Sequence, residues 1–120
     1  MRLPLLTCLS LLTLASPAVA QSFDALHQRT EADRAARGSI PNGTFTSIHY
    51  LLDVAERIAP RYEEQSEAWK TRAVQFLDSV EQGRDPYPQG RGQILNRGYQ
   101  PTFTPTRQGY AIYLPPDYDP

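Results

Sequence analysis

A change of pattern near Gly83 constrains the fold of this chain more than any other feature. Before it, apolar side chains recur at intervals of three and four residues, a spacing that predicts helices with one buried face. After it, prolines, glycines and tyrosines follow one another closely, which favours turns and short strands. The 120-residue sequence therefore predicts an α+β arrangement: a helical region over residues 21–83, a linker over 84–98 and a β-hairpin over 99–120.

Three helices are expected in the helical region, and their apolar stripes differ in width. The first has only a thin apolar edge around Phe23 and Leu26, with Ser22 placed to cap its N-terminus. The second has a broad stripe, and the third carries Trp69 and Phe76 on one face, where their large rings can pack. The expected ranges are residues 22–37, then 44 or 46 to 59, and then 60–82.

Two strands are expected after the linker, a weak one over residues 99–104 and a strong one over 108–114. One face of the second strand carries Tyr110, Ile112 and Leu114, and the other carries Ala111 and Tyr113. A strand that is apolar on both faces is usually covered on both, and an isolated hairpin is marginal in water. We therefore expect the sheet to continue in protein beyond these residues.

Residues 1–20 have the three parts of a secretory signal peptide. Arg2 supplies the positive start, residues 3–15 form an apolar run, and Ala18 and Ala20 form a small-residue cleavage site. The run is shorter than the roughly 20 apolar residues that a membrane span needs. We expect a secreted or periplasmic protein with no membrane span after cleavage.

The single cysteine, Cys8, lies inside the predicted signal, too early to serve as a lipid attachment site. Cleavage would leave a chain without a disulfide, a thiolate metal site or a cysteine nucleophile. The formal net charge is −1, and no basic patch indicates a nucleic-acid partner.

The string R-Q-G-Y-A-I-Y-L-P-P-D-Y-D-P at residues 107–120 resembles the lead-in of secreted α/β-hydrolases of the esterase, depolymerase and prolyl-oligopeptidase-like kinds. The resemblance rests on Tyr110, Tyr113, Leu114, Pro115, Pro116, Tyr118 and Asp119. It implies that the hairpin opens an α/β-hydrolase sheet, and that a Ser-His-Asp triad, a G-x-S-x-G elbow and an oxyanion hole follow in a downstream domain.

None of these catalytic elements can be assigned to residues of this sequence, so no catalytic, cofactor-binding or metal-binding residue is predicted. The resemblance implies the N-terminal fragment of an exported serine hydrolase that cleaves ester or peptide bonds. The fragment itself would be non-catalytic, with the downstream hydrolase domain as its partner and no cofactor. The alternative is a complete small secreted helical interaction module with a strand-pairing tail.

Two histidines each have a carboxylate four residues further along the same predicted helix. The spacing of His27 and Glu31, and of His49 and Asp53, predicts ordinary pairing on the surface of each helix. The functional alternative is that each histidine is a general base oriented by its carboxylate. A metal site formed by the two histidines and a carboxylate is a further alternative, which spacing alone does not test.

Two more groups invite functional interpretations. Asp117 and Asp119 suggest calcium, but a turn is favoured because an EF-hand loop is longer and needs a central glycine and a distal glutamate. Aromatic rings can stack on sugars, but packing between domains explains the tyrosines of the linker and hairpin equally well. These tyrosines are Tyr87, Tyr99, Tyr110, Tyr113 and Tyr118.

Overall fold

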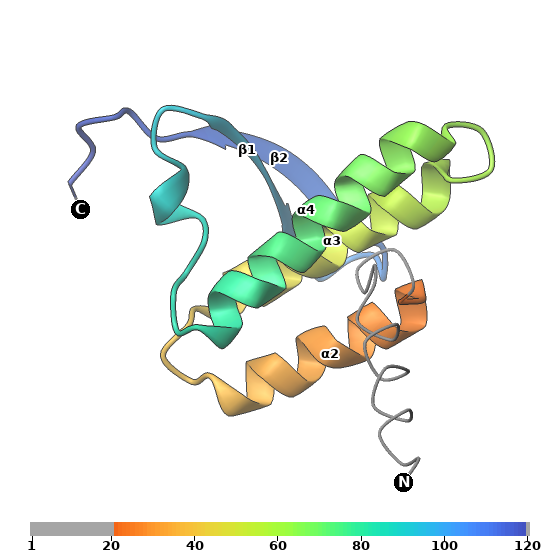
Figure 1. Ribbon diagram of the computed structural model, residues 1–120, viewed down its shortest axis with the longest axis horizontal. Coiled ribbons are helices and arrows are strands. Elements are labelled where there is room, and N and C mark those ends of the chain that lie inside the picture. Colours follow the sequence, from red (N-terminus) through yellow and green to blue (C-terminus); the bar gives the residue numbers. More distant parts are fainter. Residues whose placement is uncertain (1–20, 120) are drawn as a thin grey trace, which may run out of the picture.

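The computed structural model describes residues 21–119, so the predicted signal peptide lies outside the described residues. Within this range, three helices are followed by a short 3-10 turn and a two-stranded antiparallel hairpin, which confirms the α+β prediction (Figure 1). The elements are α2 (Phe23–Ala36), α3 (Asn42–Ile58), α4 (Glu63–Glu81), η2 (Pro88–Gly90), β1 (Ile94–Tyr99) and β2 (Gln108–Tyr113).

The helices begin and end close to their predicted positions because local signals fix their ends. The Ser22 hydroxyl accepts a hydrogen bond from the Ala25 amide at 3.0 Å, as expected of an N-cap. Gly83, with φ of 83°, ends α4 in a backbone conformation that other residues rarely adopt. The third helix starts three residues later than predicted, because a turn after α3 occupies residues 59–61.

A single apolar cluster joins the helices, with α3 packed between α4 and the hairpin and α2 lying on the opposite side (Figure 1). The Ser66 hydroxyl adds a buried hydrogen bond from α4 to the Ala55 carbonyl of α3, at 2.6 Å. Trp69 and Phe76, expected to dominate the third helix, are only partly buried at the margin of this cluster. The buried members are Leu26, Ile40, Phe45, Ile48, Leu51, Leu52, Ala73, Val74, Leu77 and Val80.

The hairpin corrects one prediction. Its second strand lies where expected, but its first strand occupies residues 94–99, of which all but the last fall in the predicted linker, and residues 100–107 form the connecting loop. Pro101 and Pro105 have no N–H for a ladder, which disfavours the predicted strand over residues 99–104. The earlier segment instead buries Leu95 and Gly98.

The register of the hairpin is set by a pair of glycines under one tyrosine. The partners are Ile94↔Tyr113, Leu95↔Ile112, Asn96↔Ala111, Arg97↔Tyr110, Gly98↔Gly109 and Tyr99↔Gln108. A Cβ atom added at either Gly98 or Gly109 would collide with the side chain of Tyr50 on α3. The absence of side chains at this pair therefore lets α3 lie directly against the sheet.

Replacing Gly98 with alanine is expected to lower the free energy of unfolding by about 1–3 kcal/mol, because the new methyl overpacks the contact with Tyr50. Urea denaturation of the chain from residue 21 onward, followed by circular dichroism, measures the change. The control is Gly38→Ala, which meets open space and should stay within about 0.5 kcal/mol of the parent. Equal effects at the two positions would contradict the packing role of Gly98.

Candidate functional site

Two histidines meet between α2 and α3. The Nδ1 atoms of His27 and His49 lie 2.6 Å apart, and the rings lie edge to edge, with centroids 4.9 Å apart and an angle of 14° between their planes. The His49 side chain is buried, and that of His27 is partly buried. Such a short distance requires one nitrogen to donate and the other to accept, so a single proton lies between the two rings.

Each histidine faces a carboxylate on the opposite helix, which corrects the predicted pairing. His49 Nε2 lies 2.6 Å from Glu31 Oε2 of α2, and His27 Nε2 lies 3.6 Å from Asp53 Oδ1 of α3. The sequence had predicted the pairs within each helix. Because α2 and α3 pack with the two rings edge to edge between them, each outer ring nitrogen points to the neighbouring helix instead.

Two arginines complete this group, which we call the histidine cluster: His27, Glu31, Arg34, His49, Asp53 and Arg107. Arg107 comes from the loop between β1 and β2, and its Nε and Nη2 atoms bind the two Asp53 oxygens at 2.6 and 3.1 Å. Arg34 Nε lies 3.3 Å from Glu31 Oε2. The cluster thus ties α2, α3 and the hairpin loop together, with two carboxylates balancing two guanidinium groups.

The hydrogen bonds assign the protons of the pair. The Glu31 carboxylate accepts, so His49 carries its proton on Nε2 and its Nδ1 accepts from His27 Nδ1–H. Burial, the largest cause, lowers the pKa of His49 below its ordinary value, although Glu31 acts in the other direction. The hydrogen bond from His49 is the main cause that lowers the pKa of Glu31.

The metal interpretation of these histidines does not fit the geometry. Two ring nitrogens that bind one zinc ion tetrahedrally are roughly 3.3 Å apart, given Zn–N bonds of about 2.0–2.1 Å. The Nδ1 atoms are 2.6 Å apart and share a proton. Across residues 21–119, no group of three or more histidine, cysteine or acidic side chains is arranged to hold a metal ion.

An open hollow next to the cluster is lined by His27, Gln28, Glu31, His49 and Arg107.

The hairpin offers a second candidate site, at the outer edge of β2. The inner edge of β1 is closed by side chains: the Ser47 hydroxyl accepts from the Gly98 amide at 3.1 Å, and the Tyr87 hydroxyl donates to the Asn96 carbonyl at 2.9 Å. In an antiparallel ladder, hydrogen-bonded and non-hydrogen-bonded pairs alternate. Since Gly98 bonds away from β2, the amides and carbonyls of its partner Gly109, and of Ala111 and Tyr113, face outward.

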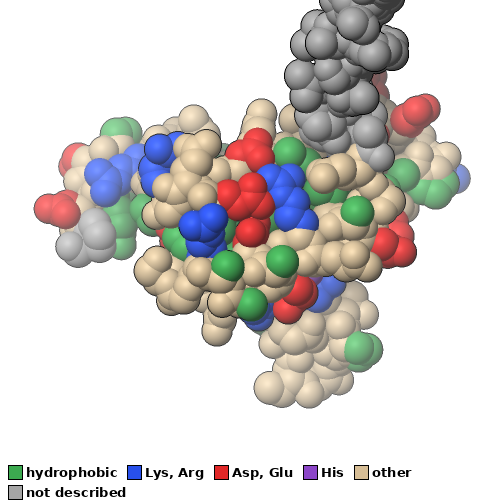
Figure 2. Space-filling model, turned by 60° about the horizontal axis from the view of Figure 1, so that its bottom comes forward, with side chains coloured by type: hydrophobic (Ala, Val, Ile, Leu, Met, Phe, Trp, Pro, Cys, Tyr) green, Lys and Arg blue, Asp and Glu red, His purple; other side chains and the backbone are tan. Residues whose placement is uncertain are grey.

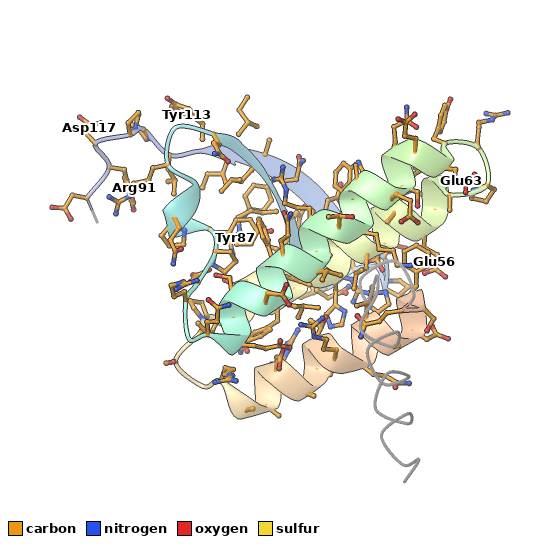
Figure 3. The ribbon with its side chains drawn as sticks, viewed as in Figure 1. Glu56, Glu63, Tyr87, Arg91, Tyr113 and Asp117 are labelled. Carbon is orange, nitrogen blue, oxygen red and sulfur yellow. The ribbon has the colours of Figure 1, made fainter. Side chains whose placement is uncertain are left out.

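Both faces of β2 are largely uncovered within the described part of the chain. Tyr110 is 47% exposed and Tyr113 53% exposed, and Tyr113 lies at the end of β2 that leads into the C-terminal arm (Figure 3). Tyr99 of β1 lies beside Tyr110, with ring centroids 6.1 Å apart. The strand that the sequence predicts to be apolar on both faces is therefore an exposed edge strand with an open hydrogen-bonding edge.

Tyr87 does not belong to an aromatic platform. It is 2% exposed and lies between α4 and the sheet (Figure 3), with its ring 5.0 Å from that of Phe76 in a T-shaped pair and the Arg97 guanidinium 4.2 Å from its centroid. Burial is the main cause that raises its pKa to about 12. Tyr99, Tyr110, Tyr113 and Tyr118 are exposed. Asp117 lies on the exposed C-terminal arm, in the turn that was predicted there.

Sequence reasoning missed Arg107, Ser47 and Tyr50, which position the two candidate sites. The paired glycines at 98 and 109 were a usable signal, because glycines at matching positions of two strands indicate a close approach by another element. No comparable local signal pointed to Ser47 or Arg107, whose partners lie about fifty residues away in sequence.

Comparison with known proteins does not extend this description: no family model, curated protein or solved structure matches the chain. Over residues 21–119, no helix is both long enough and apolar enough to cross a bilayer.

Replacing Ser47 with alanine is expected to cost about 1–3 kcal/mol, since it leaves the buried Gly98 amide without its hydrogen-bond acceptor. Thermal or urea unfolding of the chain from residue 21 onward measures this loss. The matched control is Thr46→Ala, whose hydroxyl donates to the Asn42 carbonyl within the same helix. If the two variants proved equally stable, the proposed closure of the β1 edge by Ser47 would be wrong.

Proposed function

We propose that this chain is the N-terminal, non-catalytic part of an exported serine hydrolase that cleaves ester or peptide bonds. In this proposal the helices form an extension, and β2 is an early strand of the hydrolase sheet. The observation that carries the proposal is the exposed strand β2, which has an open edge and lies within the hydrolase-like string of residues 107–120.

The open edge supports a further strand in a specific place. Outward-facing amides and carbonyls repeat at Gly109, Ala111 and Tyr113, which is the pattern that an added strand pairs with. The inner edge of β1 is closed by Ser47 and Tyr87, so the two-stranded sheet can grow in only one direction. The next strand of the sheet would therefore lie beside β2.

The placement of the helices is compatible with a larger sheet. Tyr50 of α3 covers the Gly98–Gly109 pair on one face of the hairpin, while the face that bears Tyr110 and Ile112 is not covered by α3. Strands of α/β sheets are covered on both faces. The proposed hydrolase domain would cover the Tyr110 face and leave the helical extension as it is.

The chemistry in this proposal comes from the downstream domain. The two histidines bind each other, and His49 binds Glu31 rather than a serine, and the sequence contains no G-x-S-x-G elbow. The triad and the oxyanion hole that the resemblance implies would therefore follow this chain, and residues 21–119 would contribute packing and position.

The second candidate, a separate secreted interaction module, rests on the same open edge. In that case the strand added to β2 belongs to another protein, as in other cases of strand addition. In the first proposal β2 belongs to a long polypeptide with a hydrolase domain, and in the second it belongs to a small separate protein. Isolation of the polypeptide that carries β2 from its natural source therefore distinguishes the two functions.

The test uses an antibody raised against residues 21–119 and a fluorophosphonate probe, which reacts with activated serines. We expect the antibody to recover from the exported fraction a polypeptide much larger than the 13.5 kDa of this chain, and we expect the probe to label it. Recovery of an unlabelled polypeptide of 13.5 kDa or less would overturn the hydrolase proposal and favour the interaction module.

The exposed hairpin also makes a prediction for the chain from residue 21 onward when it is purified alone. The double variant Tyr110→Ser and Tyr113→Ser should bind markedly less hydrophobic dye, because both rings contribute to the uncovered surface. The control is Tyr62→Ser, which removes a tyrosine of similar exposure (51%) from the turn between α3 and α4. Equal dye binding by the double variant and the parent would show that the hairpin is not the exposed apolar surface.

A further inference from the structure

Helix α2 is held to the rest of the protein mainly by polar contacts. Its apolar contribution to the core is Leu26, with Phe23 packed at the margin. Arg29 binds Glu81 at 2.6 and 2.7 Å and Asp78 at 2.8 Å, and thereby joins α2 to α4. Figure 2, with the α2 side turned forward, shows acidic and basic side chains gathered together on this face.

The histidine pair is the corresponding contact between α2 and α3, and its geometry limits how many protons it can hold. The neutral pair holds two protons on four ring nitrogens, one of them between the rings. A third proton can be accommodated on His27 Nε2, which faces Asp53 at 3.6 Å. A fourth proton would put an N–H donor on both Nδ1 atoms, which lie 2.6 Å apart. Two donors that point at each other cannot form a hydrogen bond and repel one another at this distance.

The charges around the pair do not offset that fourth proton. The charged groups that face the histidine pair are Glu31 and Arg34 of α2, Asp53 of α3 and Arg107 of the hairpin loop. Asp53 is already bound by both guanidinium nitrogens of Arg107, and Glu31 is shared with Arg34. Two imidazolium rings would therefore add two positive charges to a site in which the other four charges already balance.

We propose that the His27–His49 pair is an acid-released latch, which holds α2 against α3 at neutral pH and lets it go when both rings are protonated. Release separates the two hydrogen-bonded rings, removes Leu26 from the core cluster and exposes the surface of α3 beneath it. An exported protein meets solutions of different acidity, so such a latch would make the position of α2 depend on its surroundings. This inference is independent of the hydrolase proposal.

The direction of the pH dependence follows from proton counts. The pKa of His49 is lowered in the folded state, so the open form binds more protons below the ordinary histidine pKa of about 6.5, and closure weakens as the pH falls through that range. Asp33, which faces Glu81, Arg29 and Arg37, acts in the opposite direction. Burial raises its pKa to about 7, so its contribution to closure declines as the pH rises from about 4 to 7.

Amide hydrogen exchange tests the latch in the chain from residue 21 onward, with rates corrected for the intrinsic effect of pH. In the Asp33→Asn variant, which lacks the opposing titration, protection of α2 relative to α4 should fall roughly tenfold to thirtyfold between pH 6.5 and 5.0, because one extra proton in the open form shifts opening tenfold per pH unit. In the parent chain the fall should be smaller, because Asp33 opposes it over the same pH range. Unchanged protection of α2 in the Asp33→Asn variant would overturn the proposal.

The separating variant is His27→Asn. Its amide can donate to His49 Nδ1, or rotate and accept from a protonated His49, so the head-to-head clash is absent at any pH. When His27→Asn is added to Asp33→Asn, the fall in protection of α2 between pH 6.5 and 5.0 should be markedly smaller than in Asp33→Asn alone, because only the burial of His49 then resists protonation. An undiminished acid response in the double variant would show that the pair is not the latch.

A second measurement does not depend on how well the variants fold. Imidazole nitrogen shifts of the parent chain should titrate in two separate steps, because the second proton meets the first. If both rings instead took up their protons together near the ordinary histidine pKa, the rings would not share a proton, and the latch proposal would be wrong.

Discussion

The burial of α3 on several sides is the constraint on which the rest of the structure depends. Nine of its seventeen residues are buried, more than a helix resting on one partner would need. Its apolar stripe packs against α4. Its Ser47 and Tyr50 side chains contact the hairpin. Its His49 contacts α2, and its Asp53 binds the hairpin loop. Each neighbouring element is therefore positioned by a different side of the same helix.

The chemistry of these contacts differs, and this difference has functional consequences. The contact with α4 is apolar and insensitive to pH, since it consists of side chains such as Leu52 and Leu77. The contact with α2 consists largely of charged and titratable groups, whose strength depends on protonation. The contact with the hairpin fixes one face and one edge of the sheet and leaves the other edge open for an added strand.

Patterns confined to one element could be predicted from the sequence. The broad apolar stripe located α3, Ser22 and Gly83 marked helix ends, and the apolar run that ends at residue 114 located β2. These features depend on neighbours within a few residues, where side-chain spacing and backbone preferences are decisive.

Features that depend on how elements meet could not be predicted in the same way. The first strand lies earlier than expected because contacts with Ser47 and Tyr50, about fifty residues away, select residues 94–99 over the proline-containing segment. The histidines pair with carboxylates of the opposite helix because of how α2 and α3 pack. Spacing of four residues within one helix carries no information about that packing.

The account depends most on the claim that the outer edge of β2 pairs with another strand in the native protein. Residue-resolved hydrogen exchange at Gly109, Ala111 and Tyr113 tests it, with the protein from its natural source compared with residues 21–119 alone. The account predicts that these three amides exchange slowly in the native protein and rapidly in the shorter chain. Rapid exchange in both would contradict it, because the edge would then be open in the native protein as well.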